Sequence, residues 1–296
     1  MFTGLSAFPL TPLRDDQVDL AAYTRLIDRL VAADVDSIGA LGSTGSYAYL
    51  DRSERRAVSA ATIEHSGDVP VIVGISALRT SQVRALAADA QEVGTDAVLL
   101  APVSYQALTE DDVAGLYEDV TAELSVPLVL YDNPGTTHFT FSLDLYAHIA
   151  QLPHVEAIKI PPISGSVAEV RERIQAIRAV IPEQVHLGIS GDGAGATGLL
   201  AGCDAWFSVL GGTVPGAAAT IARLAAAGDD AALTESARLA PLWDLFAEHG
   251  SLRVTATIAE HLGLVTAPCL PRPLRGLDGE DRKRVIDAIE ALVLAE

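Results

Sequence analysis

Lysine is rare in this chain, and one lysine lies where its chemistry would be unusual. Only two of the 296 residues are lysines, and Lys159 lies within the apolar run 155–162. Lysine is seldom buried unless it is paired or has a functional role. Burial disfavours the ammonium form, and a neutral amine can attack a carbonyl to form a Schiff base. The alternative is a lysine at a strand end that reaches solvent or a carboxylate.

Two other segments carry hydroxyl groups suited to such chemistry. The loop Gly42-Ser43-Thr44-Gly45-Ser46 follows an apolar run and could present backbone N–H groups to a carboxylate. Clusters of this composition are also common in plain turns. Tyr131 ends another apolar run. Next to a hydroxyl such as that of Ser43 it could pass a proton, or it could simply fill the top layer of a barrel.

Glycine-rich segments follow two later apolar runs, and metal-binding patterns are missing from the sequence. Ser190–Gly193 and the segment 208–212 contain glycines, including Gly191, that would let a ligand approach the backbone. His138 lies just beyond the Tyr131 loop and could enter the site or lie on the surface. The seven histidines and two cysteines lack metal-ligand spacing, so we expect no metal.

The elements that must position these residues alternate along the chain. Continuous apolar runs predict eight parallel strands covered on both faces, over residues 4–10, 37–41, 69–75, 97–101, 128–131, 157–160, 185–189 and 205–209. Helical periodicity and capping signals predict intervening helices over 18–33, from 51, 79–93, from 109, 143–151, 167–180, 194–201 and 216–226.

Eight such units predict an α/β fold, a (βα)8 TIM barrel over residues 1–228 with its active site at the strand C-terminal ends. Residues 229–296 predict a three-helix extension packed on the barrel, with the proline-rich break 268–273 before the last helix. The structural alternative is a doubly wound open sheet. It is disfavoured because Pro9-Leu10-Thr11-Pro12, rather than a Gly-x-Gly-x-x-Gly motif, follows the first strand.

The composition of the chain indicates which classes of partner it can bind and which cellular compartment it suits. The net charge is −19, from 20 basic and 39 acidic residues, so no basic surface is expected for nucleic acid. No apolar run reaches the ~20 residues that span a bilayer, and the N-terminus lacks a signal-peptide pattern. Cys203 and Cys269 fit a reducing compartment. We expect a cytoplasmic protein without a membrane partner.

Taken together, the strand ends resemble those of the dihydrodipicolinate synthase / N-acetylneuraminate lyase family of class I Schiff-base aldolases. The resemblance covers nearly the whole chain. The matching segments, in order along the chain, are Phe8–Pro12, the Gly-x-Thr-Gly loop at 42–45, the Tyr-x-x-Pro motif at 131–134, Lys159, Ser190-Gly191-Asp192 and the proline-rich C-terminal segment. Each motif is modest alone, and the order and spacing make the set specific.

The resemblance implies a role for each matching residue. Lys159 would condense with the keto group of pyruvate or another 2-oxo acid, and Tyr131 would shuttle protons. Ser43 and Thr44, with the loop amides of Gly42 and Gly45, would hold the carboxylate. The imine on lysine replaces any dissociable cofactor. Family members are mostly homotetramers built as dimers of dimers, so a homotetramer is expected.

Several positions depart from the synthase pattern. Ser43 replaces a threonine and Ser46 a glutamate. Thr136 stands where the synthase has an arginine that grips the carboxylate of its aldehyde substrate, and threonine cannot make that bidentate contact. The synthase also inserts a tyrosine across the dimer interface. That position here is Val103 or Ser104, and Tyr105 would replace it only if the loop shifts.

Two further departures concern strand 8. Gly212 replaces an asparagine, and Phe207 stands where a smaller aliphatic residue is usual, which could narrow the site or favour a hydrophobic acceptor. The resemblance therefore predicts a lyase that condenses or cleaves pyruvate, or another 2-oxo acid, with an uncharged or weakly polar aldehyde. The alternatives are a dihydrodipicolinate synthase proper, a 2-oxo acid dehydratase or hydratase-aldolase, and a non-catalytic 2-oxo-acid-binding relative. A phosphate-binding barrel isomerase is also open, but leaves Lys159 without a role.

Overall fold

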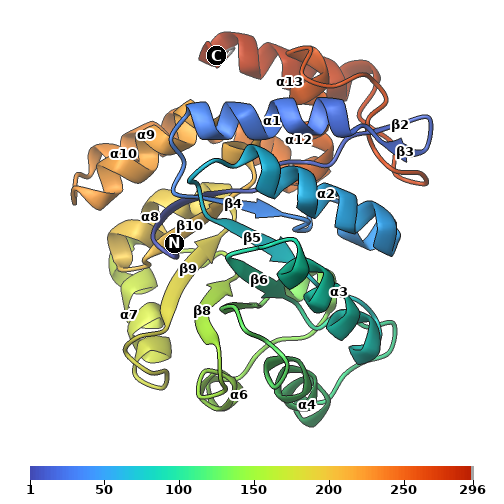
Figure 1. Cartoon of the computed structure of the whole chain (residues 1–296). Coiled ribbons are helices and arrows are strands. Elements are labelled where there is room, and N and C mark those ends of the chain that lie inside the picture. Colours follow the sequence, from blue (N-terminus) through green and yellow to red (C-terminus); the bar gives the residue numbers. More distant parts are fainter. Residues whose placement is uncertain (295–296) are drawn as a thin grey trace.

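The computed structural model describes residues 1–294, and its centre is a closed barrel of eight parallel strands. Around the barrel the strand order is β1-β10-β9-β8-β7-β6-β5-β4. Figure 1 shows β4, β5, β6, β8, β9 and β10 at the centre, with helices outside them. The strands are β1 (Gly4–Ala7), β4 (Ser37–Ala40), β5 (Val71–Gly74), β6 (Ala97–Leu100), β7 (Leu128–Tyr131), β8 (Val155–Ile160), β9 (His186–Ser190) and β10 (Ala205–Ser208). The predicted TIM barrel is confirmed, and the open sheet is wrong.

Helices follow the strands around the outside. They are α1 (Leu20–Ala32), α2 (Arg52–His65), α3 (Thr80–Glu92), α4 (Glu110–Thr121), α5 (Pro134–Thr137), α6 (Leu143–Ile149), α7 (Val167–Arg178), α8 (Gly195–Ala201) and α9 (Pro215–Ala226). Short 3-10 turns lie at η1 (Tyr47–Tyr49), η2 (Asp192–Ala194) and η3 (Leu210–Gly212). The expected capping box forms at Asp51 and Glu54, which satisfies the free N–H groups at the start of α2.

The N-terminal segment differs from the prediction in detail. The first strand ends at Ala7 rather than residue 10, and a small hairpin, β2 (Leu13–Arg14) with β3 (Gln17–Val18), follows. Helix α1 starts at Leu20 because the Asp19 side chain accepts a hydrogen bond from the Ala22 amide at 3.0 Å. A capping carboxylate one residue after Val18 therefore fixes the helix start.

The C-terminal extension contains four helices in the described residues, so the expectation of three is wrong. They are α10 (Ala231–Arg238), α11 (Ala240–His249), α12 (Ser251–His261) and α13 (Gly279–Leu292). Leu239 divides α10 from α11, and Pro241 in the first turn of α11 has no amide to continue the earlier helix. Gly250, at φ 82°, divides α11 from α12. The proline-rich segment does precede the last helix.

The extension packs against the start of the chain. Leu10 and the α1 residues Ala22 and Leu26 form a buried apolar cluster with residues of α12 and the loop after it: Ala256, Ala259, Val265, Cys269 and Leu270. The Leu13 amide also donates to the Cys269 carbonyl at 2.9 Å. Figure 1 shows α12 and α13 beside α1, at one side of the barrel. The division of the chain at residue 228 stays a prediction.

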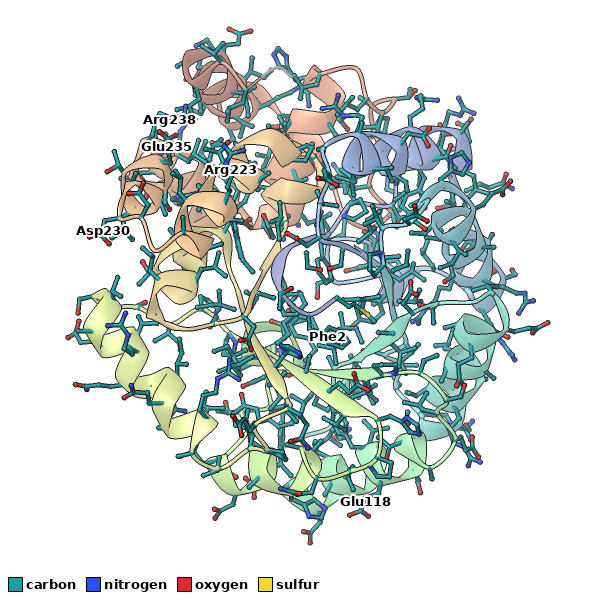
Figure 2. The ribbon with its side chains drawn as sticks, turned by 60° about the vertical axis from the view of Figure 1, so that its left-hand side comes forward. Phe2, Glu118, Arg223, Asp230, Glu235 and Arg238 are labelled. Atoms are coloured by element: carbon teal, nitrogen blue, oxygen red, sulfur yellow. The ribbon has the colours of Figure 1, made fainter. Side chains whose placement is uncertain are left out.

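Apolar side chains fill the barrel interior. The inner cluster comprises Phe2, Phe8, Ile72, Ala97, Leu99, Ala101, Val129, Tyr131, Ala157, Ala205 and Phe207. Phe2 precedes β1 and lies near the centre of the helix ring in Figure 2. Phe8, Tyr131 and Phe207 lie toward the opposite end, where the strands end. Among the described residues, no helix is long and apolar enough to cross a membrane.

Candidate active site

Lys159 lies inside the barrel near the end of β8, and only 5% of its surface is exposed. Its Nζ lies 3.9 Å from the ring centre of Phe8, 4.3 Å from that of Tyr131 and 5.1 Å from that of Phe207. Burial lowers the Lys159 pKa to about 7, against an opposing electrostatic effect of Asp192. A large share of this amine is therefore unprotonated near neutral pH, as nucleophilic attack requires.

Asp192 is the buried carboxylate that acts on Lys159. It accepts hydrogen bonds from the Ser208 hydroxyl at 2.5 Å, the Leu210 amide at 3.1 Å and the Val209 amide at 3.3 Å. Burial raises its pKa, while these hydrogen bonds and the lysine lower it. Asp192 belongs to the predicted Ser190-Gly191-Asp192 motif, but no role was predicted for its side chain. Its position directly after a strand was the available signal.

Tyr131 and Ser43 are brought together, as expected. Tyr131 ends β7 and is 7% exposed, and burial raises its pKa to about 12. A hydrogen bond with Ser43 acts in the opposite direction. The Asn133 side-chain amide donates to the Ser43 hydroxyl at 3.3 Å. The tyrosine is therefore a neutral hydroxyl at physiological pH, with a second hydroxyl beside it that can relay a proton.

The Gly42–Ser46 loop closes over the end of β5 with very little free space. A Cβ at Gly74 would lie 1.9 Å from the Leu41 carbonyl oxygen, and one at Gly42 would lie 2.5 Å from the Phe8 ring. Leu41 and Ser46 both adopt φ 55°, so the chain turns sharply on either side of the loop. Thr44 and Gly45 are buried. The loop predicted to bind a carboxylate thus lies at the carboxyl end of the barrel.

The remaining predicted site residues divide into buried and exposed groups. Phe207 is buried against Phe8, with ring centres 5.8 Å apart, so it lies beneath the lysine. Gly191 has φ 84°, and a Cβ there would lie 2.8 Å from Pro162. Thr136 is exposed on α5, and Tyr105 is 89% exposed. Neither of these two side chains is packed beside Lys159 within this chain.

Phe8 is a neighbour of Lys159 that sequence reasoning missed. It follows the end of β1 and was quoted only as the start of a motif, yet its ring is the aromatic group nearest to Nζ among the three. A Cβ at Gly39 would lie 2.2 Å from this ring. A glycine in β4 therefore makes room for Phe8, and this complementarity between strands is invisible in either segment alone.

Other reactive groups lie apart from this cluster. Among residues 1–294, the one group with metal-ligand proximity is Glu248, His249 and Asp281 on α11 and α13. Arg284 forms ion pairs with both of its carboxylates. Burial raises the pKa of Cys203 and of Cys269 to about 12, so both thiols are protonated at neutral pH. None of these groups has the environment of a nucleophile or a resident metal site.

A (βα)8 barrel with a buried amine of lowered pKa at the end of β8, and a tyrosine–serine pair from the ends of β7 and β4, defines a class I aldolase-type lyase. The model of the "Dihydrodipicolinate synthetase family" matches residues 1–292. The chain belongs to this family of Schiff-base lyases.

Individual relatives agree with that membership. A 4-hydroxy-tetrahydrodipicolinate synthase of Salinibacter ruber is 31% identical over 99% of this chain and 97% of its own length. The crystal structure of a dihydrodipicolinate synthase from Agrobacterium tumefaciens C58 is 42% identical, with a TM-score of 0.94 and 98% of each chain covered. A chloride-inhibited dihydrodipicolinate synthase of Acinetobacter baumannii, solved in complex with pyruvate, is 25% identical with a TM-score of 0.89. That match covers 99% of this chain and 100% of the other.

Proposed function

We propose that this protein joins pyruvate, or another 2-oxo acid, to an aldehyde, or catalyses the reverse cleavage, through an imine on Lys159. The observation that carries the proposal is the environment of Lys159. Its amine is buried among three aromatic rings, and its pKa is lowered to about 7. A lysine in this environment is poised to attack a carbonyl rather than to hold a surface charge.

The chemistry follows from the neighbouring groups. The neutral Nζ attacks the keto carbon, water leaves, and a protonated imine forms. Loss of a proton from the adjacent carbon sends the C–H electron pair into a carbon–carbon double bond and the imine π pair onto nitrogen. The resulting enamine attacks the aldehyde. Tyr131, with Ser43 behind it, is the hydroxyl placed to carry protons in these steps.

The Gly42–Gly45 loop is the part of the proposed site that holds the substrate carboxylate. Ser43 and Thr44 supply hydroxyl groups, and in this proposal the loop amides are further donors at the carboxyl end of the barrel. The lysine itself provides the electrophilic activation, so the proposal requires no dissociable cofactor or metal. The proposed location is the cytoplasm and the proposed assembly a homotetramer, as the family resemblance implies.

The aldehyde is the part of the reaction in which this chain departs from the synthase pattern. Thr136 lies exposed on α5 and has no charge to offer an anionic aldehyde. Buried Phe207 adds apolar surface inside the barrel end. Both features favour an uncharged or weakly polar aldehyde. The second candidate is a dihydrodipicolinate synthase proper, which the names of the relatives and the 42% identity to the Agrobacterium tumefaciens enzyme favour.

Pyruvate loss in the presence of a panel of aldehydes tests both candidates. The panel contains matched pairs with and without a carboxylate, and Lys159→Arg is the control because it keeps the charge without a nucleophilic amine. We expect aldehyde-dependent pyruvate loss by the wild type alone, fastest with the uncharged member of each pair. Preference for the carboxylate-bearing aldehydes would instead support the synthase candidate. No loss with any aldehyde, in either direction, would count against both.

A further inference from the structure

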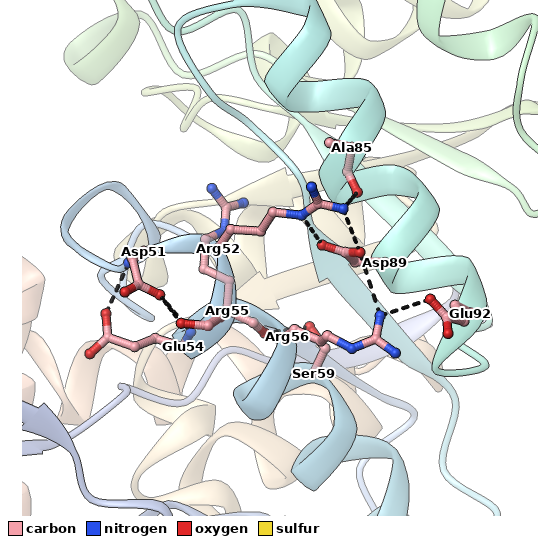
Figure 3. A network of polar contacts seen from close by, with 10 residues as sticks. Asp51, Arg52, Glu54, Arg55, Arg56, Ser59, Ala85, Asp89 and Glu92 are labelled. Atoms are coloured by element: carbon pink, nitrogen blue, oxygen red, sulfur yellow. Dashed lines mark hydrogen bonds and ion pairs between the residues drawn. The ribbon is translucent and has the colours of Figure 1, made fainter.

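Three arginines close together on α2 have different environments. Arg52 and Arg56 point outward to α3, where both contact Asp89 and Arg56 also contacts Glu92, as Figure 3 shows. Arg55 instead turns inward and is 5% exposed. Its guanidinium donates to the carbonyl oxygens of Ser76 at 2.9 Å and Gly74 at 2.8 Å. Of the three, it is the buried one, and it is held by uncharged oxygens at the end of β5.

Arg55 lies against the ring of Tyr47. Its Cζ is 5.3 Å from the Tyr47 ring centre, within cation–π range. Burial lowers the Arg55 pKa to about 10, so the guanidinium remains charged at neutral pH. Burying a charge is costly unless nearby groups satisfy it. Two carbonyl oxygens satisfy the terminal nitrogens and the aromatic face lies against the group, while Nε has no hydrogen-bond partner within the described residues. These contacts fix the guanidinium and the Tyr47 ring relative to each other.

Tyr47 belongs to the chain segment that follows the proposed carboxylate loop. Ser46 turns the chain at φ 55°, and its amide donates to the Ser43 carbonyl at 3.1 Å. The turn buries Tyr47, which is 7% exposed. Its hydroxyl has Ser76 as a hydrogen-bond partner and also acts electrostatically on Tyr131. The turn that joins Ser43 to Ser46 thus places a second buried tyrosine directly after the residue that pairs with Tyr131, on the same chain.

We propose that Tyr47 is a positioning residue for proton transfer, giving the Tyr131–Ser43 pair a third buried hydroxyl from within the same subunit, with Arg55 and Ser76 holding it in place. The inference rests on the proposed function. When the C3 proton leaves the imine of pyruvate, Tyr131 accepts it at Oη as its own proton passes to Ser43. Ser43 in turn releases its own hydroxyl proton to a water molecule beside the Tyr47 hydroxyl, and the return step reverses the path. No oxidant or co-reactant is needed.

Tyr49 is the matched control. It lies on the same 3-10 turn as Tyr47, and its side chain is 48% exposed whereas that of Tyr47 is 7% exposed. Tyr47→Phe and Tyr49→Phe remove the same hydroxyl group from a buried and an exposed position of one turn. The proposal requires the first to matter and the second to be dispensable.

The test follows proton exchange at the pyruvate methyl group in heavy water by NMR, because this needs no aldehyde. Borohydride trapping of the imine is measured in parallel. In Tyr47→Phe we expect borohydride to trap the pyruvate imine to the same extent as in the wild type. The pyruvate methyl protons should exchange at least ten-fold more slowly, with an altered pH profile of exchange. Tyr49→Phe is expected to exchange within two-fold of the wild type. A merely structural role for Tyr47 would change thermal stability and leave the exchange rate per trapped subunit unchanged.

The outcomes separate this inference from the proposed function. If Tyr47→Phe and the wild type both form the trapped imine and exchange methyl protons at the same rate, this inference is overturned and the proposed function is not. An equal or larger loss in Tyr49→Phe also overturns this inference, because it would show that the buried position of the Tyr47 hydroxyl is not what matters. A wild type that is folded but neither trapped nor able to exchange the protons overturns the proposed function, and this inference with it.

Discussion

Tyr131 and Lys159 are direct partners across the parallel strands β7 and β8, and the lysine Nζ lies 4.3 Å from the tyrosine ring centre. Residues paired in register on adjacent strands project to the same face of a sheet, which here is the barrel interior. The residue proposed to form the imine and the residue proposed to move protons are therefore fixed to each other by backbone pairing rather than by mobile loops.

The rate of imine formation should increase as pH rises through about 7 and then level off. The reason is that the Lys159 pKa is lowered to about 7, and only the neutral amine attacks. Borohydride trapping at saturating pyruvate, measured from pH 5.5 to 9, checks this. A midpoint near the ordinary lysine value of 10.5 would show that burial does not tune the amine.

Replacing Lys159 should also change stability in a pH-dependent way. The folded pKa is below the unfolded one, so between about 7 and 10.5 the unfolded chain binds more protons and wild-type stability rises with pH. Lys159→Met should be more stable than wild type at pH 6, by about 1–4 kcal/mol as for other buried charges replaced by apolar groups. Urea unfolding at pH 6 and pH 9 measures the difference. The prediction fails if the gap does not shrink at the higher pH.

Asp192→Asn should lower the pH midpoint of trapping. The Asp192 carboxylate favours the ammonium form of Lys159, so its removal lets the lysine lose its proton at lower pH. The variant should also lose about 1–3 kcal/mol of stability, because the Ser208 hydroxyl and the Leu210 amide lose a charged acceptor. Ser190→Ala, two residues earlier at the end of the same strand, is a suitable control. An unchanged or raised midpoint would exclude Asp192 as the electrostatic partner.

Tyr131→Phe should separate imine formation from the proton steps. The ring that contacts Lys159 remains, while the hydroxyl that pairs with Ser43 is lost. Turnover should fall by about 10²–10⁴-fold, the usual contribution of a positioned proton carrier, while pyruvate is still trapped. Steady-state kinetics and trapping on the same preparation measure both. Equal losses in the two assays would indicate a role in binding or folding instead.

Gly74→Ala should disrupt the carboxylate loop. The added Cβ would lie 1.9 Å from the Leu41 carbonyl oxygen, so the backbone of the loop must move. We expect a loss of about 1–3 kcal/mol or more in stability and a higher KM for pyruvate. Gly115→Ala in α4 is the control, since nothing lies within 4 Å of its Cβ. That substitution should stabilise by about 0.5–1 kcal/mol. Equal effects of Gly74→Ala and Gly115→Ala on stability would contradict the close packing of Gly74 against the Leu41 carbonyl.

The barrel was predictable because each strand has its own local pattern. Continuous apolar runs and capping residues such as Asp51 mark the ends of strands and helices without knowledge of the rest of the chain. The two element boundaries that were predicted wrongly also depend on local features. The start of α1 depends on the side chain of Asp19, and the separation of α10 from α11 depends on Leu239 and Pro241.

The site was predictable only where a residue type was unusual for its place. A lysine in an apolar strand stands out, whereas Phe8 is an ordinary core residue until the space left by Gly39 directs its ring toward Lys159. Tyr47 similarly gains its position from a turn at Ser46 and from Arg55 on the next helix. These roles depend on contacts between segments far apart in the chain, and no single segment encodes them.

Imine formation at Lys159 is tested by the intact mass of the protein after incubation with pyruvate and borohydride, with Lys159→Ala as the control. We expect one reduced pyruvate adduct per chain in the wild type and none in the folded variant, with the modified peptide containing Lys159. A folded wild type that gains no adduct from pyruvate or from other 2-oxo acids would contradict the central claim, as would an adduct that persists in Lys159→Ala.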